Sequence, residues 1–176
     1  MEGLALDLLK LVIFVPFVIV VCVCIYKFAN KDSKIKTEYD ERQKALKGRS
    51  YMYGFYTLVI WECFLTVLNA GGYELTSMPM YAIHSLGIFI GIIVICVHGI
   101  WTEAYWGLNN NKRRYIGVFA VLFVINALPL VMVATHGNQL AAEDFPYLNL
   151  YVTVMLIVLG ITSLIKKAVD KKEEEE

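Results

Sequence analysis

Two histidines, His84 and His98, lie in one long apolar stretch of the chain. An imidazole can bind a metal ion or move a proton, so its position on a helix is informative. At about 100° per residue, both histidines share a helix face, about 60° wide, with Gly87 and Gly91. This face therefore carries two imidazoles on either side of a glycine groove, and we expect other helices to pack into that groove. The Gly-x-x-x-Gly spacing suits either packing within one chain or formation of a homodimer.

Glu62 and Asn126 are the other polar residues at the middle of apolar stretches. A carboxyl at mid-bilayer costs about 2.5 to 3.5 kcal/mol on insertion scales, so it should face the helix bundle and find a partner. Counting from the predicted membrane boundaries places Pro16 at nearly the same depth, and a proline inside a helix frees one backbone carbonyl. We therefore expect Glu62, Asn126 and Pro16 to form a small polar site that exchanges a proton or binds a ligand. The alternative is a structural hydrogen bond between helices.

The fourteen-residue separation of His84 and His98 resembles the histidine spacing in the haem-carrying helices of membrane cytochromes b. A bis-histidine haem also needs an imidazole on a facing helix, and His136 is the remaining histidine. A haem or quinone redox protein is therefore one interpretation of this face. The sequence contains no recognisable zinc-ligand set, nucleophile elbow or phosphate loop, so we expect no enzyme activity, no metal and no resident cofactor.

Long apolar segments must position these residues. Of the 176 residues, 58% are hydrophobic, well above the usual content of a soluble domain. The pattern predicts one all-α integral membrane domain with five spanning helices, at about residues 4–28, 51–70, 80–101, 115–135 and 147–165. The charged tail, residues 166–176, is expected to be solvated. Cys22, Cys24, Cys63 and Cys96 lie inside apolar runs and are interpreted as small buried hydrophobic residues.

A hydrophilic segment between the first two spans predicts a short amphipathic helix at about residues 38–47, with Thr37 as its N-cap and Gly48 at its end. Its charged residues are candidates for docking a partner protein. These are Glu38, Asp40, Glu41 and Arg42. The pairs Glu38 with Arg42 and Asp40 with Lys44 have the i,i+4 spacing that stabilises a helix.

Lysines and arginines gather after the first, third and fifth apolar segments, whereas the two intervening loops carry Glu74, Glu143 and Asp144. By the positive-inside rule, the N-terminus lies outside and the C-terminus in the cytosol. The 16 basic residues balance the 16 acidic ones, so nothing suggests a nucleic-acid partner. The expected partners are the lipid bilayer, a cytosolic or membrane protein, or a second copy of the chain.

The run from Glu38 to Phe55 contains Asp40-Glu41-Arg42-Gln43 directly before a membrane helix. This element resembles one found in small uncharacterised membrane proteins of Gram-positive bacteria, often encoded beside small DNA-binding regulators. The resemblance covers about twenty residues and implies a bacterial plasma membrane. It implies no activity.

These observations favour a non-enzymatic membrane protein that binds, senses or regulates a partner, with the helix at residues 38–47 reporting on the bundle. An alternative is a small transporter or permease subunit in which Glu62 couples ligand binding to a proton and Asn126 orients the ligand. The haem or quinone protein built on His84 and His98 is the third interpretation.

Overall fold

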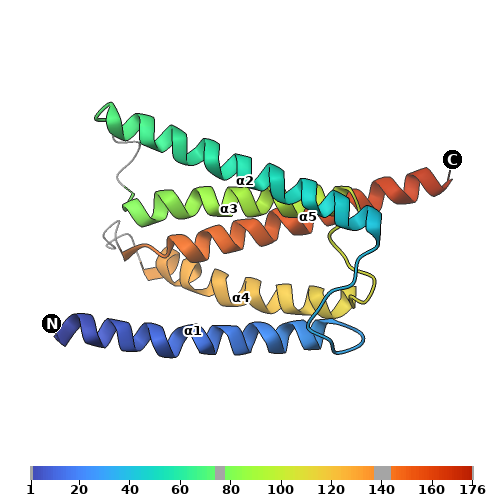
Figure 1. Cartoon of the computed structure of the whole chain (residues 1–176), viewed down its shortest axis with the longest axis horizontal. Coiled ribbons are helices and arrows are strands. Elements are labelled where there is room, and N and C mark those ends of the chain that lie inside the picture. Colours follow the sequence, from blue (N-terminus) through green and yellow to red (C-terminus); the bar gives the residue numbers. More distant parts are fainter. Residues whose placement is uncertain (1, 74–77, 137–143, 176) are drawn as a thin grey trace. The chain divides into compact units, whose positions relative to one another are not determined.

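The computed structural model describes residues 2–73, 78–136 and 144–175, and its fold there is all-α, with helices joined by loops (Figure 1). Side chains are described from residue 12 onward, except at 13, 14 and 136. The described helices are α1 (Glu2–Ala29), α2 (Glu41–Ala70), α3 (Met80–Trp101), α4 (Lys112–His136) and α5 (Tyr147–Glu175). Glu74 and Glu143, which were used to orient the chain, lie outside the described residues.

Four helices, α2 to α5, are long and apolar enough to cross a membrane. In α1, the described apolar stretch is the shorter Val15–Ala29, so the fifth span stays a prediction. Many large apolar side chains on these helices are exposed, among them Ile60 at 69% and Val124 at 62%. Such surfaces are unfavourable in water and suit contact with lipid chains. The chain is therefore a helical membrane protein.

The separate short helix predicted at residues 38–47 is wrong. One helix, α2, begins at Glu41 and continues without a break to Ala70. Its N-cap is Asp40 rather than Thr37, because the Asp40 carboxylate accepts a hydrogen bond from the Gln43 amide at 2.6 Å. Gly48 does not end the helix. A glycine in a helix interior costs only about 1 kcal/mol, which the rest of a 30-residue helix easily offsets.

The charged tail continues α5 as a helix to Glu175, about ten residues beyond the predicted end of the fifth apolar segment. Ion pairs at i,i+4 spacing support this extension. Lys166 pairs with Asp170, and Lys171 lies 3.5 Å from Glu175. The tail residues are largely exposed, as expected for a solvated segment.

The chain divides into two compact units, of which one consists of Met1–Glu38 and Gly107–Val118, and the other of Tyr39–Trp106 and Phe119–Glu176. In the second unit, α3 packs against both α2 and α5. Against α5, Ala82 is fully buried beside Tyr147 and Tyr151, and the Tyr151 hydroxyl donates to the Ala82 carbonyl at 3.2 Å. The helix that the sequence marks as the centre of the bundle is the central helix of this unit.

Candidate functional site

The face of α3 that carries the two histidines and two glycines packs against α2, as the sequence predicts. The closest approach is between Gly54 of α2 and Gly91 of α3, where a Cβ atom on Gly54 would lie 2.7 Å from the Gly91 carbonyl oxygen. One turn further along, the Trp61 ring lies over Gly87 in the space that a side chain would fill. Small residues at these two positions let the helix backbones approach closely, which is the main source of helix association in lipid.

At one end of this interface, Glu62 of α2 contacts His84 of α3. The His84 Nδ1 atom lies 2.8 Å from the Glu62 Oε2 atom. The His84 side chain is 45% exposed and the Glu62 side chain is 39% exposed, so the pair lies at the edge of the helix contact. Neighbouring Trp61 is fixed by its indole N–H, which donates to the Ile83 carbonyl at 3.1 Å. A carboxylate and an imidazole in contact can share a proton, bind a cation or accept a hydrogen-bonding ligand.

At the other end of the interface, His98 contacts Ser50, which is 1% exposed. The Ser50 hydroxyl lies 2.7 Å from His98 Nδ1 and donates to the Leu46 carbonyl at 3.0 Å. The hydroxyl therefore lies within hydrogen-bond distance of both the Leu46 carbonyl and the His98 ring. The ring of Tyr53 lies edge-on to the imidazole, with centroids 5.0 Å apart. His98 is thus held by two neighbours from α2.

This geometry bears on two predictions for the same face. Gly87 and Gly91 pack within the chain against α2, which is one of the two alternatives expected for them, and a homodimer stays a prediction. Each of the two imidazoles contacts α2 through its Nδ1 atom, and the interpretation of His84 and His98 as haem ligands stays a prediction. The side chain of His136 lies outside the described residues.

Asn126 is not the partner of Glu62. Its amide group donates to the Leu122 carbonyl at 2.8 Å and accepts from the Asn149 side chain of α5 at 3.2 Å. The predicted polar site is therefore replaced by two separate contacts, Glu62 with His84 and Asn126 with Asn149. Pro16 lies inside α1, which belongs to the other unit, and its predicted roles in the polar site and in helix packing stay predictions.

The Asp-Glu-Arg-Gln element begins α2. Asp40 and Gln43 form a reciprocal capping box, and the Gln43 side chain also donates to the carbonyls of Glu103 and Trp106 at 3.1 and 3.2 Å. These two residues fix the start of α2 to the turn that follows α3. Glu41 and Arg42, which lie between Asp40 and Gln43 in the sequence, are exposed.

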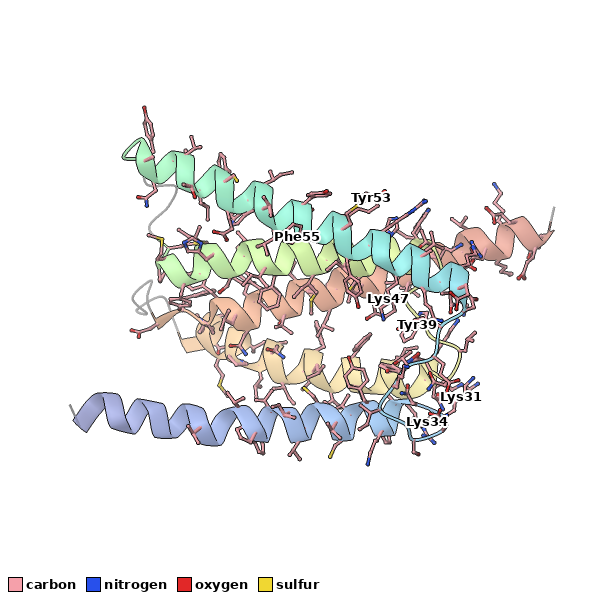
Figure 2. The ribbon with its side chains drawn as sticks, in the orientation of Figure 1. Lys31, Lys34, Tyr39, Lys47, Tyr53 and Phe55 are labelled. Atoms are coloured by element: carbon pink, nitrogen blue, oxygen red, sulfur yellow. The ribbon has the colours of Figure 1, made fainter. Side chains whose placement is uncertain are left out.

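The predicted ion pairs of this element differ from the observed ones. Glu41 pairs with Lys44 at 2.6 Å, whereas Glu38 precedes the helix and pairs with Lys34 at 3.1 Å. Nearby, the Lys47 ammonium lies 3.9 Å from the centre of the Tyr39 ring (Figure 2). Of the four predicted docking residues, Glu41 and Arg42 are the ones free of a structural role in capping or in the loops.

In the other unit, buried asparagines join the loop after α1 to the loop before α4. Asn109 donates to both Asp32 carboxylate oxygens at 3.2 Å and to the Lys36 carbonyl at 3.0 Å, and accepts from the Glu38 amide at 2.9 Å. Asn30 is fully buried and donates to the Lys34 carbonyl at 2.8 Å. Hydrogen bonds thus join these two loops in one polar network, which sequence reasoning missed.

Electrostatics in this network follow its hydrogen bonds. Desolvation acts to raise the pKa of Asp32, but the Lys34 amide, the Asn109 side chain and the Lys34 charge outweigh it and lower that pKa from 3.8. Hydrogen bonding to Glu38 and the nearby carboxylate charges raise the pKa of Lys34 above 10.5. Both groups therefore stay charged near neutral pH.

Other residues missed at the α2–α3 interface carried a signal in the sequence. Ser50, Gly54, Leu58 and Trp61 recur at helical spacing and share the face of α2 that carries Glu62. Asn149 had a weaker signal in the sequence, because it is a polar residue near the start of an apolar helix. No sequence signal identifies the partners of Asn109 and Asn30, because a side-chain amide does not reveal its contacts across more than seventy residues.

Within the described part of the chain, no group of three His, Cys, Asp or Glu residues could hold a metal ion. The four cysteines are free thiols, and Cys22, Cys24 and Cys63 are exposed on helix surfaces rather than buried. Comparisons with protein-family models, with curated proteins and with solved structures found no match.

Proposed function

We propose that this chain is a non-enzymatic multi-span membrane protein that binds or senses, with Glu62 and His84 as its ionisable element. The observation that supports this function is the 2.8 Å contact between a carboxylate and an imidazole on two apolar helices, with both side chains partly exposed. Protein atoms do not fully enclose the pair, and in this proposal its exposed part receives a proton, a cation or a small polar ligand.

The low dielectric of a membrane favours states of the pair with no net charge. One proton held between the carboxylate and the imidazole gives such a state. Loss of that proton leaves a negative charge, and gain of a second leaves a positive one. A ligand or partner that brings a charge or a hydrogen bond to this position therefore changes which protonation state of the pair is favoured. That change alters the contact between α2 and α3, which carry Glu62 and His84.

The α2–α3 interface transmits a change in the pair to the rest of the two helices. Trp61 precedes Glu62, and its indole donates to the carbonyl of Ile83, the residue before His84. A change in the pair therefore acts on the contact between Trp61 and Gly87 and on the packing of the two helices. Because α2 continues to Glu41 without a break, a shift of this helix also moves its first turn.

Trp61 supplies the test. In a variant with Trp101→Phe and Trp106→Phe, Trp61 is the remaining tryptophan, and its emission is followed in nanodiscs from about pH 4 to pH 10, a range that brackets ordinary carboxyl and imidazole titration. We expect a titration that Glu62→Gln alters and that Glu62→Gln combined with His84→Gln abolishes. The matched control is His98→Gln, which removes the other imidazole of the α2–α3 interface and should keep the titration. A flat profile in the parent protein, or a profile that survives the loss of both Glu62 and His84, would refute the proposal.

The proposed setting is a bacterial plasma membrane with five spans, an external N-terminus and a cytosolic C-terminus. The distribution of basic residues along the loops supports this orientation. The first turn of α2 then faces the cytosol, where exposed Glu41 and Arg42 are the proposed contacts for a partner protein. Glu41→Ala combined with Arg42→Ala should release such a partner without disturbing the capping box formed by Asp40 and Gln43.

The partial exposure of Glu62 and His84 also favours a second candidate function, proton-coupled transport. Proteoliposomes carrying a pH gradient and loaded with Na⁺ or K⁺, with an internal pH dye, test it directly. Transport predicts faster decay of the gradient than in protein-free vesicles and loss of this effect in Glu62→Gln. Equal decay in all vesicles would leave binding or sensing without transport.

A further inference from the structure

The end of α1, the first turn of α4 and the loops beside them carry an excess of positive charge. Residues 27–38 and 107–114 contain seven lysines and arginines but only Asp32 and Glu38 as acids. Two of the cations are engaged: Lys34 pairs with both acids, and Arg114 donates to the Phe28 carbonyl at 3.1 Å. The other five are exposed and have no side-chain partner within the described residues. They are Lys27, Lys31, Lys36, Lys112 and Arg113.

The asparagine network holds these cations at fixed backbone positions. The Lys31 amide donates to the Asn109 carbonyl at 2.8 Å, and the Lys36 carbonyl accepts from the Asn109 side chain. Lys112 follows Asn111, whose amide donates to the Ala29 carbonyl at 3.0 Å. Figure 2 shows the Lys31 and Lys34 side chains on the loop after α1. Charges from two distant parts of the sequence are thus gathered on one ordered platform, which lowers the entropy cost of binding an anion.

The position of the platform along the chain identifies the kind of anion. It lies where the apolar stretch of α1 ends at Ala29 and where α4, a candidate membrane span, begins at Lys112. Exposed apolar side chains, Ile35 at 50% and Leu108 at 58%, lie among the cations. Cations mixed with apolar side chains at the end of membrane helices suit the headgroup region of a bilayer.

We propose that residues 27–38 and 107–114 form a binding site for the headgroups of anionic phospholipids. The free cations contact the phosphate and the negative headgroup, and Ile35 and Leu108 enter the upper part of the acyl region. A free anion in solution would gain nothing from the two apolar side chains, so the lipid is the occupant that uses the whole surface. This site is independent of the Glu62–His84 pair.

The test compares spin-labelled phosphatidylglycerol with spin-labelled phosphatidylcholine in vesicles of phosphatidylcholine that contain the full chain. The measured quantity is the relative association of each labelled lipid with the protein. The test variant removes three platform charges: Lys31→Gln, Lys36→Gln and Lys112→Gln. The control removes three exposed lysines from α5: Lys167→Gln, Lys171→Gln and Lys172→Gln.

At low salt we expect the parent chain and the α5 control to associate more strongly with phosphatidylglycerol than with phosphatidylcholine. In the platform variant the ratio of the two associations should fall by at least about tenfold, because each lysine or arginine near an anionic surface contributes about 1 kcal/mol. The preference should weaken as salt rises. Equal losses in the two triple variants would overturn the proposal, as would no loss in the platform variant. Inorganic phosphate that displaces the labelled lipid more than chloride does at the same ionic strength would indicate a free-phosphate site and also overturn it.

Discussion

Replacing Gly54 by alanine tests the closest contact between α2 and α3. The new Cβ atom would lie 2.7 Å from the Gly91 carbonyl oxygen and 2.3 Å from the nearest atom of the Ile95 side chain. Ile95 can rotate away, but the Gly91 oxygen belongs to the backbone, so the helices must separate by roughly 0.7 Å to regain ordinary van der Waals contact. Overpacking of this kind costs about 1 to 3 kcal/mol, and the better helix propensity of alanine returns about 1 kcal/mol. We therefore expect a net loss of up to about 2 kcal/mol.

Gly48 is the matched control, because it lies in the same helix and a Cβ atom there meets nothing within 4 Å. Gly48→Ala should raise the free energy of unfolding by about 0.5 to 1 kcal/mol. The assay is unfolding by SDS in detergent micelles, followed by far-UV circular dichroism. The reasoning is refuted if Gly54→Ala is as stable as Gly48→Ala, because the close backbone contact would then be absent.

Four further variants test the caps and the loops. Asp40→Ala should lower stability by about 1 kcal/mol and speed amide hydrogen exchange in the first turn of α2, whereas Glu41→Ala, which leaves the capping box intact, should change stability by less than about 0.5 kcal/mol. Asn109→Ala leaves the Glu38 amide without its partner and should cost about 1 to 3 kcal/mol, seen as faster hydrogen exchange in residues 30–38; unchanged exchange there would count against the network. The pKa of Asp32 is below 3.8 in the fold, so its stabilising contribution is present above about pH 4 and is lost as pH falls through the folded pKa. Protection of the same loop, which is the exchange rate compared with the intrinsic rate at each pH, should therefore fall at low pH in the parent chain, and Asp32→Asn should remove most of that loss.

The helix positions and the packing face of α3 could be predicted because both follow from periodicity. A run of apolar residues long enough to span a bilayer identifies the helix, and about 100° per residue places the histidines and glycines together. The beginning of α2 was also available in principle, since Asp40 and Gln43 have the spacing of a capping box. Treating Gly48 as a helix end overestimated the weak effect of a glycine inside a long helix.

The partner of Glu62 was predicted incorrectly because depth in the membrane was used in place of register between neighbours. Asn126 and Glu62 were matched by their distance from the predicted boundaries, which ignores which helices touch. In an antiparallel pair, one contact fixes the others. Once Gly54 faces Gly91, the residue eight further along α2 is Glu62, and the residue seven back along α3 is His84.

The asparagine network could not be predicted for a different reason. Asn30 and Asn109 are seventy-nine positions apart, and asparagine is common in exposed loops. Their burial depends on how two loops meet, which local pattern does not encode. The consequence is functional, because the network is what orders the free cations of the proposed headgroup site.

The most direct test of the Glu62–His84 pair is nitrogen NMR of the chain labelled with ¹⁵N-histidine in nanodiscs. Glu62→Gln should shift both ring nitrogens of His84 and alter their pH dependence, because it removes the carboxylate 2.8 Å from Nδ1. The signals of His98, which contacts Ser50, should stay in place in the same variant. If the His84 signals are unchanged when the carboxylate is removed, the pair does not share a proton, and the proposed sensing element is wrong.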